Sequence, residues 1–205
     1  MIKSFWMMIK ENKKLIKIAT FIFTIGILFG NFIDPNNELI IESFEKLEGI
    51  AQEISENGSI FFTIKTIFIN NIKVAIYMIV IGIIFGIYPI IILFFNGLFI
   101  GIFINMFVEQ GQSIGALILG LLPHGIFELS AIILAAAYGM KLGFSLFKIF
   151  INKFKGKKMV DYKLRVTNII NETVVLIFGI AIILFVAAII ESTISMFIIS
   201  NMNSF

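Results

Sequence analysis

The chain has 205 residues, 59% of them hydrophobic, with a mean hydropathy of +1.03 and a formal net charge of +3. Soluble domains are about 45–50% apolar, so a chain of this length cannot bury such an excess in its own core. Its long apolar runs predict an all-α integral membrane protein, with residues 1–205 as one domain. With one histidine and no cysteine, disulfides and thiol catalysis are excluded, and we expect no metal and no cofactor.

The first predicted span covers residues 15–33. Residues 1–17 hold five lysines and a single acid, Glu11. By the positive-inside rule these lysines place the N-terminus in the cytoplasm. No small-residue cleavage site follows the apolar run, so we expect an uncleaved helix rather than a signal peptide. Gly26 and Gly30, four residues apart, predict a face on which another helix can pack closely.

Residues 34–59 predict an acidic amphipathic helix on the extracytoplasmic side. Asp34-Pro35 is a typical helix start, Asn57-Gly58 is a typical helix end, and apolar residues recur between them at helical spacing. The helix is either a solvated cover for the bundle or a docking face for an extracytoplasmic partner. In the second case the docking candidates are three of its glutamates, Glu42, Glu45 and Glu53.

The second and third spans are predicted within residues 60–107. We expect residues 60–73, which are interrupted by two lysines and two asparagines, to lie along the outer interface. The next 34 residues, 74–107, carry no charge and are too long for one span, so they predict two helices, one or both of them short, tilted or re-entrant. The turn should fall between Gly86 and Gly97. The candidate breaks are Tyr88-Pro89 and Asn96-Gly97, and the further glycine pairs are Gly82/Gly86 and Gly97/Gly101.

The segment 113–143 carries the chain's only histidine inside an apolar run rich in glycine and alanine, which predicts tight packing. His124 and Glu128 are four residues apart and can touch on one helix face. Pro123 removes a backbone donor, so we expect a kinked or broken helix at Pro123-His124-Gly125. An ionisable pair is costly in lipid. It is interpreted as a structural pair within the bundle, as a transport site, or as part of a catalytic site that lacks a nucleophile motif.

Residues 141–172 predict a basic cytoplasmic loop, with eight lysine and arginine residues. The last span, roughly 173–192, leads to an extracytoplasmic C-terminus. About five spans from a cytoplasmic N-terminus place thirteen of the sixteen basic residues on the cytoplasmic side. The aromatic residues lie in the apolar spans, away from the basic loop, so binding of nucleic acid is excluded.

The sequence LLPHGIFELSAIILAAAYGMKLG at 121–143 closely resembles the signature segment of the stage II sporulation protein M family. Two earlier pieces agree with it in the family's order, IFINNIKVAIYMIVIGIIFG at 67–86 and NGLFIG at 96–101. Ser130 stands where family members often have proline. The motif residues of the family carry over to this chain as Asn71, Asn96, Gly97, Pro123, His124, Gly125 and Glu128.

The resemblance implies a five-span bacterial membrane protein that acts in engulfment of the forespore. The founding member resembles a scaffold that recruits two peptidoglycan-degrading partners, stage II sporulation proteins D and P, to the septal membrane. The hydrolysis belongs to those partners, so this chain is not expected to be an enzyme. Its expected place is the mother-cell membrane at the forespore septum, within the lipid bilayer, and a homo-oligomer is left open. The rival hypothesis is a small transporter or channel that uses His124 and Glu128.

Overall fold

The computed structural model describes most of the chain, and every regular element within the described residues is an α-helix, which confirms the predicted class. The described residues are 2–35, 37, 38, 40–42, 45, 49, 59–111, 114–155 and 160–202, with the backbone alone for 2, 114–124, 160–165 and 194–202. The helices are α1 (Ile2–Glu11), α2 (Lys13–Gly30), α4 (Ile60–Ile81), α5 (Ile87–Glu109), α6 (Ile114–Phe154) and α7 (Val160–Met202).

Within the described residues, four helical segments are long and apolar enough to cross a membrane. They are Ile60–Ile81, Ile87–Glu109, Gly125–Phe154 and Val166–Thr193. The remaining predicted span corresponds to α2, which has 18 residues and carries three lysines near its start, Lys13, Lys14 and Lys17. Helices of this length and composition match the hydrocarbon thickness of a bilayer, about 30 Å. The chain is therefore a polytopic helical membrane protein.

The segment that connects the second and third spans differs from the prediction. Residues 60–73 are not a separate interfacial segment, because α4 runs without interruption from Ile60 to Ile81 over 22 residues. Its start is capped by Ser59, whose hydroxyl accepts from the Phe62 backbone N–H at 3.5 Å. The turn that follows spans residues 82–86 and meets the predicted window, Gly86 to Gly97, only at Gly86, so both candidate breaks are wrong. Consequently neither α4 nor α5 is short, and Asn96-Gly97 lies inside α5.

Two residues of this turn have left-handed backbone angles that reverse the chain. Phe85 has φ 56° and Gly86 has φ 69°. Glycine adopts this region without a steric penalty, whereas phenylalanine does so at a cost. Pro89 falls in the first turn of α5, where its missing N–H would have had no helical partner. Of the two predicted breaks, the one beside Tyr88-Pro89 is therefore closer to the observed turn.

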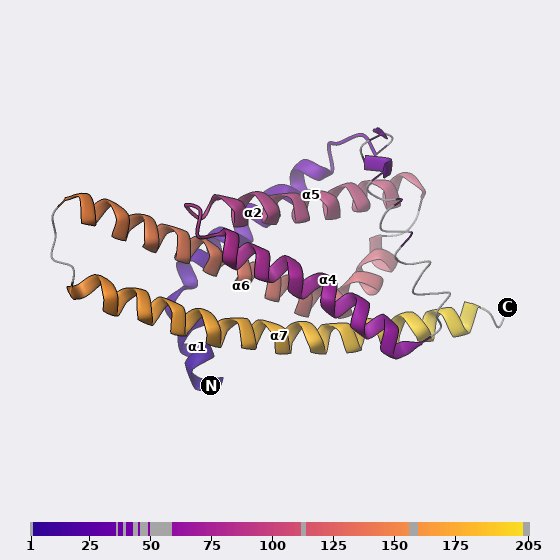
Figure 1. Ribbon diagram of the computed structural model, residues 1–205. Helices are drawn as coiled ribbons and strands as arrows, with labels where there is room; N and C mark the ends of the chain where they lie inside the picture. The colour runs from indigo at the N-terminus through magenta and orange to yellow at the C-terminus, as the bar shows by residue number, and fades with distance from the viewer. Residues whose placement is uncertain are drawn as a thin grey trace.

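Helix α6 is one helix of 41 residues, and Pro123 lies inside it. We predicted a kinked or broken helix at Pro123-His124-Gly125, and the continuous helix excludes the break but not the kink. Membrane helices tolerate an internal proline because neighbouring groups satisfy the freed carbonyl. The predicted loop 141–172 is also largely helical, because it consists of the end of α6 and the start of α7. These two helix ends form a hairpin beyond the other helices, visible at the left of Figure 1.

Helix α6 is the centre of the bundle and contacts α2, α4, α5 and α7. Alanines give it a smooth, fully buried surface, on which Ala131, Ala135, Ala136 and Ala137 have no exposed area. Figure 1 shows α4, α6 and α7 side by side, with α2 and α5 paired on one side of them. The small side chains of α6 let these neighbours approach its backbone closely.

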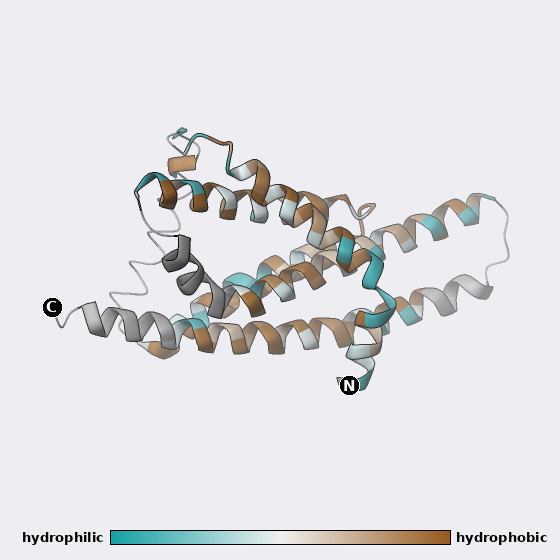
Figure 2. Ribbon diagram, turned by 180° about the vertical axis from the view of Figure 1, so that it is seen from behind, coloured by the Kyte–Doolittle hydropathy of each residue, from teal (hydrophilic) through white to brown (hydrophobic). Residues whose placement is uncertain are grey.

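The helices alternate in direction across the bundle. In Figure 1 the hairpin of α6 and α7 lies at the left, whereas the C-terminal end of α7 and the end of α5 lie at the right. Helix α1 lies across this arrangement, and the Phe5 ring packs against Gly179 of α7. Figure 2 shows apolar residues along the middle of the helices and polar residues around the junction of α1 and α2. This pattern is typical of a bundle that spans a bilayer.

Candidate functional site

The glycine pairs of α2 and α5 pack directly on each other. A Cβ atom added to Gly97 would overlap the carbonyl oxygen of Phe23, and one added to Gly101 would overlap that of Ile27. The same holds in reverse, because a Cβ on Gly26 would overlap the carbonyl oxygen of Phe94. The backbones of the two helices are therefore in contact, as the small-residue spacing predicted. The sequence did not indicate that these two pairs are partners.

A second glycine contact joins the turn between α4 and α5 to α6. A Cβ on Gly143 would overlap both the Gly86 nitrogen and the Gly82 oxygen. A Cβ on Gly82 would lie 2.6 Å from the Gly139 oxygen. The pair Gly82/Gly86 was predicted from its spacing, and its partners lie at the end of the signature segment. The signature therefore includes residues that fix the distance between α4 and α6.

The other motif residues lie on three different helices. Asn71 is half-buried on α4, and Glu128 is half-buried on α6. Asn96 is half-buried on α5, and its Nδ2 donates to the Ile92 carbonyl oxygen at 2.8 Å. This bond lies within one helix, so it stabilises α5 rather than joining it to another. The side chains of Pro123 and His124 lie outside the described residues, and so does the predicted contact between His124 and Glu128.

The hydroxyl of Ser130 is engaged by its own helix. It donates to the Ile126 carbonyl oxygen at 2.5 Å, and the residue is exposed on α6. Serines in membrane helices commonly bond the carbonyl four residues earlier in this way. Among the described residues, no three histidine, aspartate or glutamate side chains lie close enough to hold a metal ion.

A polar cluster at the start of the α6–α7 hairpin was not predicted. Asn12 is 7% exposed and donates through Nδ2 to the Tyr138 hydroxyl at 3.0 Å and to the Met8 carbonyl at 2.7 Å. The Lys141 ammonium lies 2.5 Å from a Glu172 carboxylate oxygen and 5.0 Å from the centre of the Tyr138 ring. The cluster thereby ties the junction of α1 and α2 to both α6 and α7.

One sequence signal could have found the ion pair. Lys141 and Glu172 are the two ends of the predicted basic segment 141–172, and two helices could be joined at its middle. Two antiparallel helices joined there bring such positions opposite each other, provided that the segment is helical rather than a loop. The bond between Asn12 and Tyr138 had no such signal, because these residues are 126 positions apart.

Beyond the ion pair, a cavity of about 310 Å³ opens between α6 and α7. It is lined by Lys141, Ser145, Lys148, Ile149, Asn168, Ile169 and Glu172. Most of these side chains are polar, and cations outnumber the single anion. Water can enter such a cavity and bond to these polar groups.

The family model described as Stage II sporulation protein M matches residues 19–196. The chain belongs to the stage II sporulation protein M family. Two uncharacterized proteins of Methanocaldococcus jannaschii are similar to it. One is 29% identical over 136 residues, which cover 66% of this chain and 72% of the relative. The other is 27% identical over 194 residues, which cover 90% of this chain and 83% of the relative. No solved structure matches the chain.

Membership of the stage II sporulation protein M family supports a membrane protein in sporulation. The stage II sporulation protein M family is not a known enzyme family. The matched range includes all four candidate spans, both glycine contacts and the ion pair of Lys141 with Glu172. The features described above therefore belong to the family's own region of the chain.

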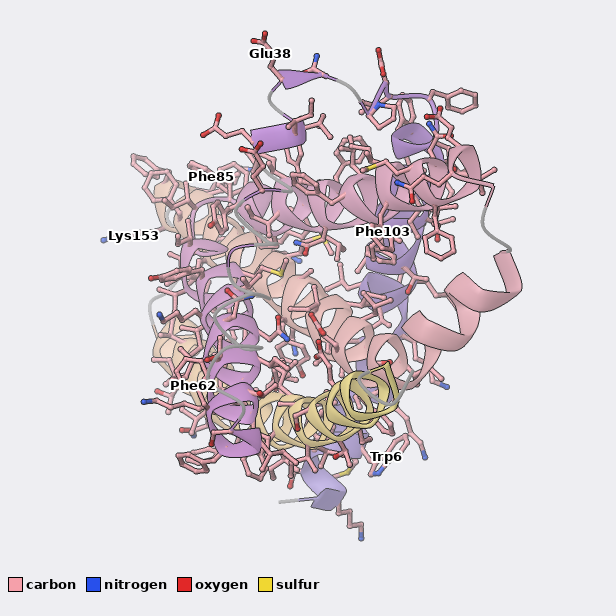
Figure 3. The ribbon with its side chains drawn as sticks, turned by 90° about the vertical axis from the view of Figure 1, so that its right-hand side faces the viewer. Trp6, Glu38, Phe62, Phe85, Phe103 and Lys153 are labelled. Atoms are coloured by element: carbon pink, nitrogen blue, oxygen red, sulfur yellow. The ribbon has the colours of Figure 1, made fainter. Side chains whose placement is uncertain are left out.

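The acidic segment also lies within the region matched by the stage II sporulation protein M model. Backbone bonds from Ile40 and Ile41 to the Asn37 carbonyl, at 2.9 and 3.0 Å, form a helical turn near the predicted start. Glu42 and Glu45 are exposed, whereas Glu53 lies outside the described residues. Figure 3 shows Glu38, from the same turn, pointing away from the bundle. The described carboxylates are therefore accessible from solvent.

Proposed function

We propose that the chain is a membrane scaffold for sporulation. It recruits peptidoglycan-degrading partners, stage II sporulation proteins D and P, to the septal membrane during forespore engulfment. The observation that carries the proposal is the family match over residues 19–196, on a chain whose described part holds four helices long and apolar enough to span a membrane. The scaffold acts from the mother-cell membrane at the septum, and the catalysis is left to its partners.

The proposed docking face is the acidic segment that carries Glu42, Glu45 and Glu53. Exposed carboxylates can steer and orient a partner with a basic surface. We expect the triple charge reversal E42K/E45K/E53K to release the partner hydrolases from membranes in co-purification. The matched control is Glu109→Lys, which reverses an exposed charge at the end of α5 instead. Unchanged recovery of the hydrolases with the triple variant would contradict this docking face.

A scaffold and a transporter predict different results for His124→Ala. If the motif supports packing and assembly, the variant loses partner recruitment, while liposomes that hold the wild type show no flux. A transporter would show pH-dependent flux that His124→Ala abolishes. The control is Ile126→Ala, because Ile126 lies two residues away on α6 and is 55% exposed. Cleavage of peptidoglycan by the purified chain alone would overturn both interpretations in favour of an enzyme.

A further inference from the structure

The end of α6 carries an exposed apolar face that the other described helices leave uncovered. Its members are Phe144, Phe147, Phe150, Ile151 and Phe154, with exposed fractions from 36% to 77%. At 100° per residue they occupy one sector of about 120° on the helix. Phe150 and Phe154 also stack edge to face, with ring centres 4.7 Å apart. We call this sector the phenylalanine face.

Lysines flank the phenylalanine face on both edges. Lys148 and Lys155 lie at one edge in the helical projection, Lys153 lies at the other, and all three are exposed. Long side chains of this kind can reach outward from an apolar surface and keep their ammonium groups in a polar layer. An apolar sector between lysines is typical of helices that lie in a membrane interface and bind anionic headgroups.

The phenylalanine face adjoins a second exposed apolar surface, at the turn between α4 and α5. The turn between the two membrane helices α4 and α5 exposes Ile83, Ile84 and Phe85 at 50%, 60% and 51%. The Phe85 ring packs edge to face on Phe147, with centres 5.1 Å apart. In Figure 3, Phe85 and Lys153 lie on the same side of the molecule. The apolar surface therefore extends without a break from the turn to the end of α6.

The opposite helix of the hairpin has a different surface. Among residues 166–172 of α7, the exposed positions are Thr167, Asn168, Ile170 and Asn171, of which Ile170 alone is apolar. Among the described side chains the hairpin is thus amphipathic, with an apolar side on α6 and a polar side at residues 166–172 of α7. Such a unit is stable when its α6 side meets an apolar layer and its α7 side meets water.

We propose that the phenylalanine face of α6 lies in the headgroup layer of an anionic lipid leaflet. The phenyl rings enter the boundary of the acyl chains, and Lys148, Lys153 and Lys155 contact lipid phosphates. The α6 side of the hairpin therefore contacts the membrane and is not surrounded by water. A second copy of the chain fits this face less well, because it would bring two sets of three lysines together.

The single tryptophan of the chain, Trp6, makes a direct test simple. In a Trp6→Phe background, one tryptophan is placed on the phenylalanine face (F150W), and a matched one on the polar side of the hairpin (N168W). Both full-length variants are reconstituted in nanodiscs of phosphatidylcholine, with and without phosphatidylglycerol. Fluorescence is measured with brominated acyl chains and with aqueous iodide as quenchers.

We expect F150W emission to shift to the blue and to be quenched by brominated lipid, most strongly with phosphatidylglycerol. N168W should be quenched by iodide instead. Equal behaviour of the two variants would overturn the proposal. So would blue-shifted F150W emission without quenching by brominated lipid, because a second protein copy would then cover the face. Adding K148Q/K153Q/K155Q should remove the effect of phosphatidylglycerol, and its persistence would refute the role of anionic lipid.

Discussion

At the scale of single residues, glycine, which has no side chain, sets the distance between α2 and α5. Gly97 was predicted both as a member of a packing pair and as part of a chain break. The structure places it inside α5, against the carbonyl oxygen of Phe23 on α2. Close approach of backbones allows dispersion contacts along the whole crossing, which drive helix association where lipid offers no hydrophobic gain.

Substitution of Gly97 by alanine should destabilise the protein by about 1–3 kcal/mol, because the new methyl group must push α2 and α5 apart. The measurement is the unfolding of the purified protein in detergent, followed by circular dichroism. Gly125→Ala is the matched control, since among the described side chains its Cβ would meet that of Leu129 at 3.6 Å, an ordinary contact. Equal stability of the two variants would show that the crossing of α2 and α5 tolerates a wider separation.

Spacing rules predicted the glycine contacts but not the polar cluster around Tyr138. Glycines four residues apart on an apolar helix are typical of a close contact with a second helix, so the spacing alone predicts that contact. Asn12, by contrast, lies within the lysine-rich stretch 1–17, where an asparagine indicates nothing in particular. Its bond to Tyr138 depends on how α1 crosses the bundle, and that is set by packing such as Phe5 on Gly179.

At the scale of helices, the polar residues of α4 led to the wrong prediction that residues 60–73 form a separate interfacial segment. Lys65, Asn70 and Lys73 suggested an interfacial segment, yet all three are exposed on the surface of a continuous helix. Its buried residues, Thr63, Ala75, Met78 and Ile79, form the packing surface. Helical hydrogen bonds are local, so outward polar side chains do not interrupt them. Lysines on such a surface can extend toward headgroups.

The ion pair between Lys141 and Glu172 should contribute to the docking of α6 on α7. The two side chains are 22% and 33% exposed, so the pair lies between the surface and buried classes. Replacing Glu172 by glutamine leaves Lys141 without its carboxylate, and we expect a loss of stability of about 1–3 kcal/mol. Thermal unfolding in detergent measures this loss.

The control for the ion pair is Lys148→Gln, which removes an exposed cation lining the same cavity. It should change stability much less, because an exposed lysine contributes little. A double-mutant cycle with Lys141→Gln and Glu172→Gln isolates the interaction between the two residues. Strictly additive effects in that cycle would show that the pair does not couple the helices.

At the scale of the whole molecule, the number of spans could be predicted better than their limits. The charge pattern required an odd number of crossings, and this requirement indicated two helices in the uncharged stretch before residue 107. The helices observed there, α4 and α5, have 22 and 23 residues. Their limits could not be predicted, because apolar runs carry no period that marks where one helix ends.

The orientation of the bundle in the membrane follows from single charges, helix directions and the number of spans together. Thirteen of the sixteen basic residues should face the cytoplasm, together with the hairpin of α6 and α7. Because the chain has no cysteine, single cysteines can be introduced without other changes. Gln110→Cys, beside the end of α5, and Lys155→Cys, at the hairpin, are both exposed positions.

In intact cells an impermeant maleimide should label Gln110→Cys and leave Lys155→Cys unlabelled until the membrane is permeabilised. The reverse pattern would mean that the lysines do not set the orientation. Labelling of both in intact cells would mean that these positions share one side, contrary to the alternating helix ends in Figure 1. The expected pattern places the acidic segment outside and the phenylalanine face of α6 at the cytoplasmic leaflet, where anionic lipids and lysines can meet.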